Sequence, residues 1–153
     1  MHPFPFSEDE WSRVNDAAAH IVNHSLLDDA VLYESGVEEM RAVLDDLRKQ
    51  HGEHPVLLET EADFVVDGAE RRILYQQAID LATKFGLPTY SARISFAHLL
   101  LVELHEPDAA IRELVACQSE LPEFADDWDR QQWTDLLAKC SKDSAARTTN
   151  QGQ

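Results

Sequence analysis

Two histidines, His20 and His24, are the residues whose type and spacing come nearest to a metal site. They stand four residues apart in "HIVNH", and in a helix this separation places both imidazoles on one face, where they can bind one ion. A stable site needs at least one or two further ligands from elsewhere in the chain. The pair is also typical of histidines near a helix end, so a metal site stays an alternative and no cofactor is expected.

Acidic residues with catalytic potential are concentrated in one short segment, which carries Glu59, Glu61, Asp63 and Asp67. A pair of carboxylates performs acid–base catalysis when its surroundings raise one pKa and lower the other. Nothing in the sequence indicates such a separation, and alternating acids usually form a solvated face. We therefore expect no catalytic residue here.

The two cysteines, Cys117 and Cys140, lie far apart and form no CxxC motif, which is typical of reduced thiols in a cytosolic protein. Cys117 occupies a packing position in a predicted helix and is expected in the core. The chain also has no glycine-rich phosphate loop and no nucleophile elbow. These features predict a protein that is not an enzyme.

The segment "LPEFADDWDRQQW" has the composition of a protein-binding surface, because aromatic residues alternate with aspartates. Aromatic anchors surrounded by acids suit a basic, hydrophobic-centred partner. Alternatively, Phe124 and one tryptophan close the end of the core while the aspartates stabilise a helix N-terminus. The predicted partner-binding residues are Phe124, Asp126, Asp127, Trp128, Asp129, Ser95 and Glu103.

These residues must be positioned by helices, since apolar residues recur at helical spacing through most of the chain. We predict an all-α domain over residues 1–140, in which about seven short antiparallel helices form a compact bundle. Residues 7–51 are expected to pack on residues 55–140, and the polar tail 141–153 is expected to be disordered. The predicted helices cover about residues 8–24, 30–51 or 36–51, 55–64, 68–85, 89–104, 107–121 and 126–140.

Residues 94–122, "ISFAHLLLVELHEPDAAIRELVACQSELP", resemble a tetratricopeptide repeat, a helix-turn-helix unit of 34 residues. Ile94 takes the large-residue position, Ala110 the small-residue position, and Pro122 closes the unit. Leu87 and Leu121 each precede a proline and stand 34 residues apart. The preceding helix pair resembles the family loosely, and the N-terminal 50 or so residues do not resemble it.

The resemblance implies helical hairpins of which the first helix lines a concave, ligand-holding face. His98 stands where the family has a small residue, so its side chain would push the two helices of the pair apart unless it tilts outward. The helix at residues 89–104 is apolar all round, which predicts burial on every side. We therefore expect the N-terminal helices to cover the concave face.

The charge balance narrows the class of partner. The chain has 29 acidic and 13 basic side chains, a net charge of −16. Such a surface repels phosphate backbones and anionic lipids, so we expect no nucleic-acid or membrane binding and favour a basic protein partner. No segment is apolar enough to span a membrane and no signal peptide is apparent, so a cytoplasmic location is expected.

Three functional hypotheses follow from these features. The first is a non-catalytic, tetratricopeptide-like module that binds a basic protein. The second is an immunity-type inhibitor of a basic toxin, because small size, acidity and missing catalytic residues suit rapid capture of such a target. The third is a helical bundle that binds a metal or another ligand through His20 and His24.

Overall fold

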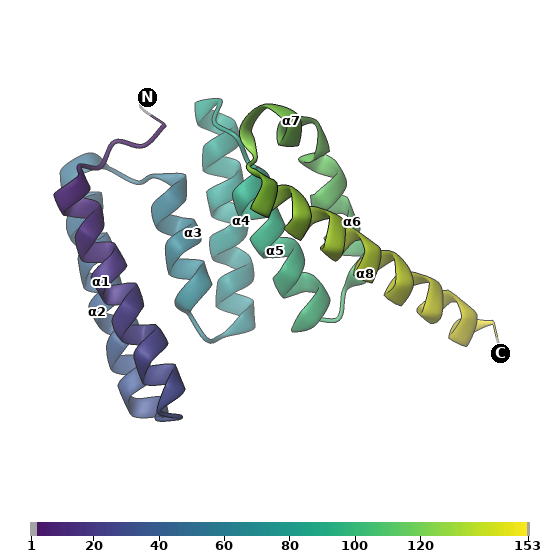
Figure 1. Ribbon diagram of the computed structural model, residues 1–153, viewed down its shortest axis with the longest axis horizontal. Helices are drawn as coiled ribbons and strands as arrows, with labels where there is room; N and C mark the ends of the chain where they lie inside the picture. Colours follow the sequence, from purple (N-terminus) through teal and green to yellow (C-terminus); the bar gives the residue numbers. More distant parts are fainter. Residues whose placement is uncertain (1–2, 153) are drawn as a thin grey trace.

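The helices of this chain lie in a row in chain order (Figure 1). The structure, a computed structural model, describes residues 3–152 and contains no strand within them, which confirms the all-α prediction. Helix α8 lies across α5 and α6 and packs against both. The elements are α1 (Glu8–Leu26), α2 (Ala30–His51), α3 (Pro55–Phe64), α4 (Gly68–Phe85), α5 (Tyr90–Val102), α6 (Pro107–Ala116), the 3₁₀-helix η1 (Gln118–Glu120), α7 (Leu121–Phe124) and α8 (Asp127–Gln151).

Side chains with local capping roles determine where the helices begin. Ser7 and Glu10 form a capping box at the start of α1, in which the Ser7 hydroxyl accepts from the Glu10 amide at 3.2 Å. Asp29 caps α2 by accepting from two backbone amides, so α2 begins at the earlier of its two predicted starts. Asp67 caps α4, and Gly86 ends it in the left-handed conformation with φ 67°.

Two hydrophobic clusters stabilise the row, and α3 contributes to both. Leu57 of α3 packs in a cluster with buried side chains of α1 and α2, including Ile21 and Leu44. The next residue, Leu58, packs in a larger cluster with side chains of α4, α5, α6 and α8. Helix α3 thus joins the N-terminal helix pair to the remaining helices.

The prediction that the fifth helix is buried on every side is wrong. Four residues at helical spacing, Ser91, Ser95, His98 and Val102, keep contact with solvent along one face of α5. The helices packed on the rest of α5 are α4, α6 and α8, whereas α2 contacts α3. The N-terminal helices therefore leave this face of α5 open, and the His98 side chain is exposed on it.

The prediction of a disordered tail after residue 140 is also wrong, because α8 continues to Gln151. The Ser144 hydroxyl donates to the Asp108 carboxylate, and the hydroxyls of Thr148 and Thr149 donate to backbone carbonyls one turn earlier. Most side chains of residues 141–150 are exposed, which agrees with the lack of apolar periodicity in this segment. Figure 1 shows this end of α8 projecting beyond the other helices. Residue 153 lies outside the described residues.

The helix predicted for residues 107–121 ends earlier, at Ala116. The 3₁₀-helix η1 and the single turn α7 follow it, and Pro122 lies in the first turn of α7. Proline has no amide hydrogen for the bond to the preceding turn, so it suits the start of a helical turn and not its interior.

Gly36 marks the closest approach of α1 and α2. A Cβ atom at this position would lie 2.9 Å from Cγ1 of Ile21, a buried side chain. We expect Gly36→Ala to lower the free energy of unfolding by about 1 kcal/mol, because overpacking costs about 1–3 kcal/mol and better helix propensity returns only about 1 kcal/mol. Urea unfolding measures the change.

Ser35→Ala is the matched control for Gly36→Ala, since Ser35 is the exposed neighbour in the same helix. It is expected to change the stability by less than about 0.5 kcal/mol. A Gly36→Ala protein more stable than the wild type would show that α1 and α2 separate readily at this point.

Candidate functional site

The two histidines of the predicted metal site contact α2. The carboxylate of Glu39 lies 3.2 Å from Nδ1 of His20, and the carbonyl oxygen of Leu32 lies 2.8 Å from Nδ1 of His24. Within residues 3–152, no three side chains of His, Cys, Asp or Glu are grouped so that they could hold a metal ion. Each histidine thus links α1 to α2 through one ring nitrogen.

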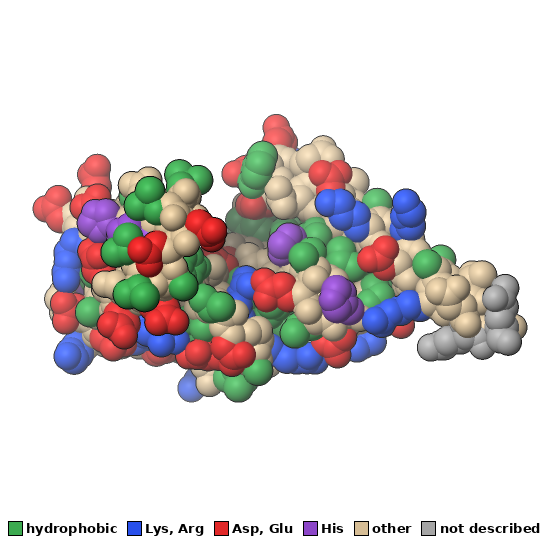
Figure 2. All heavy atoms as spheres, turned by 90° about the horizontal axis from the view of Figure 1, so that it is seen from below, with side chains coloured by type: hydrophobic (Ala, Val, Ile, Leu, Met, Phe, Trp, Pro, Cys, Tyr) green, Lys and Arg blue, Asp and Glu red, His purple; other side chains and the backbone are tan. Residues whose placement is uncertain are grey.

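A groove of about 280 Å³ lies between α3 and α8, with α5 as its floor. Seen from below, the molecule is hollowed between the part that carries α1 and α2 and the part that carries α8 (Figure 2). Ser95, one of the predicted partner-binding residues, lines this groove. The lining residues are Asp63, Arg71, Tyr75, Ile94, Ser95, His98, Gln132 and Leu136.

The alternating acids of α3 divide between two environments. Glu61 forms an ion pair with Arg48, at 2.9 Å between the charged atoms. Glu59 and Asp63 lie one helical turn apart on another face of α3. There Glu59 accepts a hydrogen bond of 2.6 Å from the Ser91 hydroxyl of α5. The expectation of a uniformly solvated acidic face is thus wrong for this segment.

Asp63 belongs to a hydrogen-bonded chain that crosses from α3 to α4. It accepts a bond of 2.6 Å from the hydroxyl of Tyr75, a buried side chain whose hydroxyl also accepts from Arg71 at 3.4 Å. Arg71 in addition donates to the Ala62 carbonyl and forms an ion pair with Glu103. These bonds fix the orientation of Asp63.

The pKa values of three neighbouring carboxylates, Glu59, Asp63 and Asp129, are raised, although Asp63 is exposed and attraction to Arg71 partly offsets the rise in its pKa. Burial raises the pKa of Glu59 to about 7, and repulsion from Asp63 and Asp129 adds to this effect. Burial also raises the pKa of Asp63, and the pKa of Asp129 is raised by burial and by Asp126. Within residues 3–152, Glu59, Asp63 and Asp129 form no ion pair with a lysine or arginine.

The predicted aromatic and acidic residues lie at the N-terminus of α8, beside this groove. Asp126 caps α8 by accepting from the amide of Asp129, which is itself partly buried. Trp128 is 71% exposed and precedes the groove residue Gln132 by one turn, so both lie on one side of α8. The aromatic border of the groove is therefore accessible to a partner.

Other predicted residues have different surroundings. Trp133 is the tryptophan that closes the core, since its indole N–H donates to the Leu114 carbonyl at 2.8 Å. Phe124 is 48% exposed and Asp127 is exposed. Glu103 is engaged by Arg71 at the end of α5.

The cysteines do not add a nucleophile to the site. Cys117 is fully buried, and burial raises the pKa of its thiol to about 11, so the thiol stays protonated at neutral pH. Cys140 is also buried, as expected for reduced core residues.

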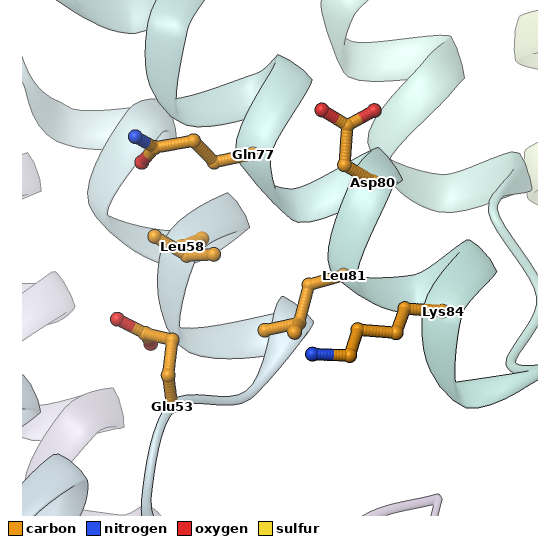
Figure 3. A pocket seen from close by; sticks show the side chains of 6 residues that line it. All are labelled: Glu53, Leu58, Gln77, Asp80, Leu81 and Lys84. Carbon is orange, nitrogen blue, oxygen red and sulfur yellow. The ribbon is translucent and has the colours of Figure 1, made fainter.

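A larger depression of about 430 Å³ lies between α3 and α4 (Figure 3). Leu58 and Leu81 line it, and Glu53, Asp80 and Lys84 at its border carry both signs of charge. It is wide open and offers no set of convergent polar groups. We therefore take the smaller groove, in which Asp63, Arg71, Tyr75 and His98 bring polar groups together, as the candidate site.

Of the predicted partner-binding residues, Ser95 lines the groove, whereas the lining residues Asp63 and Tyr75 were not among the predicted binding residues. The spacing of Glu59 and Asp63 in the sequence indicates that both lie on one face of α3. It does not indicate what surrounds that face, because the neighbouring residues belong to α4, α5 and α8. Comparison with protein families, curated proteins and solved structures finds no match to this chain.

Proposed function

We propose that this protein is a non-catalytic, tetratricopeptide-like interaction module that binds a basic segment of a protein partner in the groove between α3 and α8. One observation carries the proposal. Asp63 lines this groove, Glu59 lies close enough to Asp63 and to Asp129 for their charges to repel, and no lysine or arginine of the described residues forms an ion pair with any of the three.

A basic side chain in the groove resolves an unfavourable arrangement of charges. Carboxylates that have lost part of their hydration and repel one another gain stability when an ammonium or guanidinium group binds between them. The net charge of −16 also attracts basic proteins over longer distances and accelerates their association. The same charge disfavours nucleic acids.

The apolar and aromatic surroundings favour a peptide over a free cation. Ile94 and Leu136 line the groove, and Trp128 is exposed at its border. Aromatic anchors near charged groups are typical of protein-binding hot spots. The Ser95 hydroxyl and the Gln132 amide provide partners for a peptide backbone.

The arrangement of the helices supports the tetratricopeptide-like part of the proposal. Helices α3 and α5, the first members of two successive helix pairs, supply a wall and the floor of the groove. In the repeats that residues 94–122 resemble, the first helix of each pair lines the ligand-holding face. Helix α8 supplies the opposite wall.

The test measures the affinity of a fluorescently labelled peptide of alternating arginine and alanine. We expect Glu59→Gln/Asp63→Asn to weaken its binding roughly tenfold, equivalent to about 1.4 kcal/mol, because both charges of α3 that face the groove are lost. Fluorescence anisotropy at low salt measures the affinity, and added salt should weaken the wild-type complex.

The matched control is Asp16→Asn/Asp80→Asn, which removes the same charge from exposed positions on α1 and α4. It is expected to leave the affinity within about twofold of the wild type. Equal losses in the two double variants would contradict the proposal, because they would trace binding to the overall charge and not to the groove.

A further inference from the structure

The end of the α1–α2 pair carries an exposed apolar surface that neither the core nor the groove uses. Six of the twelve large apolar side chains that are exposed within the described residues gather here. Leu26 is 80% exposed and Val31 is 76% exposed. We call this surface the tip patch; its residues are Val22, Leu26, Leu27, Val31, Leu32 and Val66.

The tip patch is formed by a defined turn. Asp28 adopts the left-handed conformation with φ 52°, and its amide donates to the Ser25 carbonyl at 3.3 Å. Asp29 then caps α2 through the amides of Val31 and Leu32. These bonds hold the apolar side chains in their exposed positions.

A depression of about 330 Å³ adjoins the turn and extends the patch to the α3–α4 connection. Val66, Ala30 and Tyr33 contribute its apolar lining, and Asp28 and Glu34 border it. The Tyr33 hydroxyl donates to the Phe64 carbonyl at 3.0 Å, which ties α2 to the end of α3. The depression can take one large apolar side chain as an anchor.

Acidic residues predominate in the helix segments that carry most of the tip patch. Residues 14–40 include six aspartates and glutamates and no lysine or arginine. In Figure 2, hydrophobic side chains lie among acidic ones over this part of the molecule. A two-fold dimer through the patch would bring identical acidic borders together, and an anionic membrane would be repelled. A partner with basic groups around an apolar centre matches the surface.

We propose that the tip patch docks an amphipathic helix of a partner protein. The apolar stripe of that helix covers Leu26, Val31 and Val66, and its flanking lysines or arginines face Asp28 and Glu34. Burial of exposed apolar side chains supplies the affinity, and the charges select the partner. This site is separate from the groove and extends the proposed function.

The test uses a labelled amphipathic peptide of leucine and lysine at helical spacing, with a leucine–glutamate counterpart. We expect the lysine peptide to bind the full-length protein at least tenfold more tightly than the glutamate peptide. Leu26→Ser/Val31→Ser should weaken binding of the lysine peptide at least tenfold. Both side chains are exposed, so circular dichroism should show an intact helical fold.

Two control variants distinguish binding at the tip patch from nonspecific hydrophobic binding and from binding in the groove. Ile73→Ser/Val115→Ser removes two exposed apolar side chains from α4 and α6 and should leave the affinity unchanged. Glu59→Gln/Asp63→Asn alters only the groove and should also bind the helical peptide normally. The groove and the tip patch can therefore be tested independently, and a negative result for one site does not affect the test of the other.

Three outcomes would overturn the proposal. Equal binding of the lysine peptide by the wild type and Leu26→Ser/Val31→Ser would show that the patch is not the docking site. Wild-type self-association in sedimentation velocity, lost in that variant, would assign the patch to a second copy of the chain. Binding to phosphatidylcholine vesicles, lost in the same variant, would assign it to a membrane surface.

Discussion

Replacing Glu59 by glutamine is expected to stabilise the protein at pH 8 by roughly 2 to 3 kcal/mol and to have little effect near pH 4. Burial raises the pKa of Glu59 from its ordinary value of 4.5 to about 7. Between these two pH values the unfolded chain has lost this proton while the folded chain retains it. Stability therefore falls as the pH rises from about 4.5 to about 7 and then levels off.

Thermal unfolding at pH 5 and pH 8 measures this effect. For a chain of this size the glutamine variant should melt roughly 5 to 10 °C above the wild type at pH 8. The amide oxygen of glutamine can still accept the Ser91 hydroxyl bond, so the gain comes from removing the buried charge. Exposed Glu38→Gln is the control and should not change the melting temperature. Identical pH profiles for Glu59→Gln and the wild type would show that the Glu59 carboxylate is fully hydrated.

The same substitution is expected to weaken peptide binding, so stability and binding oppose each other at this residue. A cation bound beside Glu59 favours the charged carboxylate, which the empty groove disfavours. Binding of the basic peptide should therefore raise the folding stability of the wild type. The glutamine variant already has this extra stability when no peptide is bound. If Glu59 contributed only to packing, its replacement would not change folding stability and peptide affinity in opposite directions.

Helix boundaries were largely predictable because their causes are local. Ser7 and Glu10 lie three residues apart, and Asp67 and Gly86 act on the turns next to them. Each of these bonds or conformations involves only a few neighbouring residues. Their physical cause is therefore contained in a short stretch of sequence.

The exposed face of α5 and the groove depend on contacts between residues that are distant in sequence. The apolar periodicity of a single helix gives no information about such contacts. Glu59 and Glu61 look equivalent in sequence, but Arg48 of α2 pairs with Glu61 while Ser91 of α5 bonds to Glu59. Ser91 and His98 of α5 stay accessible because α3 and α8 stand apart on that side, where they form the walls of the groove. Which face is buried is decided only when the helices pack.

Replacing Leu99 by alanine is expected to destabilise the larger hydrophobic cluster by about 3 to 4 kcal/mol. Leu99 is fully buried in α5, and α4, α6 and α8 pack on this helix. Leu44→Ala is the matched control, since Leu44 is equally buried but belongs to the cluster of α1 and α2. Leu57 and Leu58, adjacent in α3, belong to different clusters, so each variant should act mainly on its own side of the row.

Hydrogen exchange resolves the two sides of the row. Leu99→Ala should reduce amide protection in α5, α6 and α8 more than in α1 and α2, and Leu44→Ala should do the reverse. Equal losses throughout both variants would show that the two clusters unfold as one unit. The floor and both walls of the groove contribute to the larger cluster, so Leu99→Ala should also impair binding of the arginine peptide. Leu44→Ala leaves the groove intact and should bind the arginine peptide with the affinity of the wild type, because the groove is lined by α3, α4, α5 and α8.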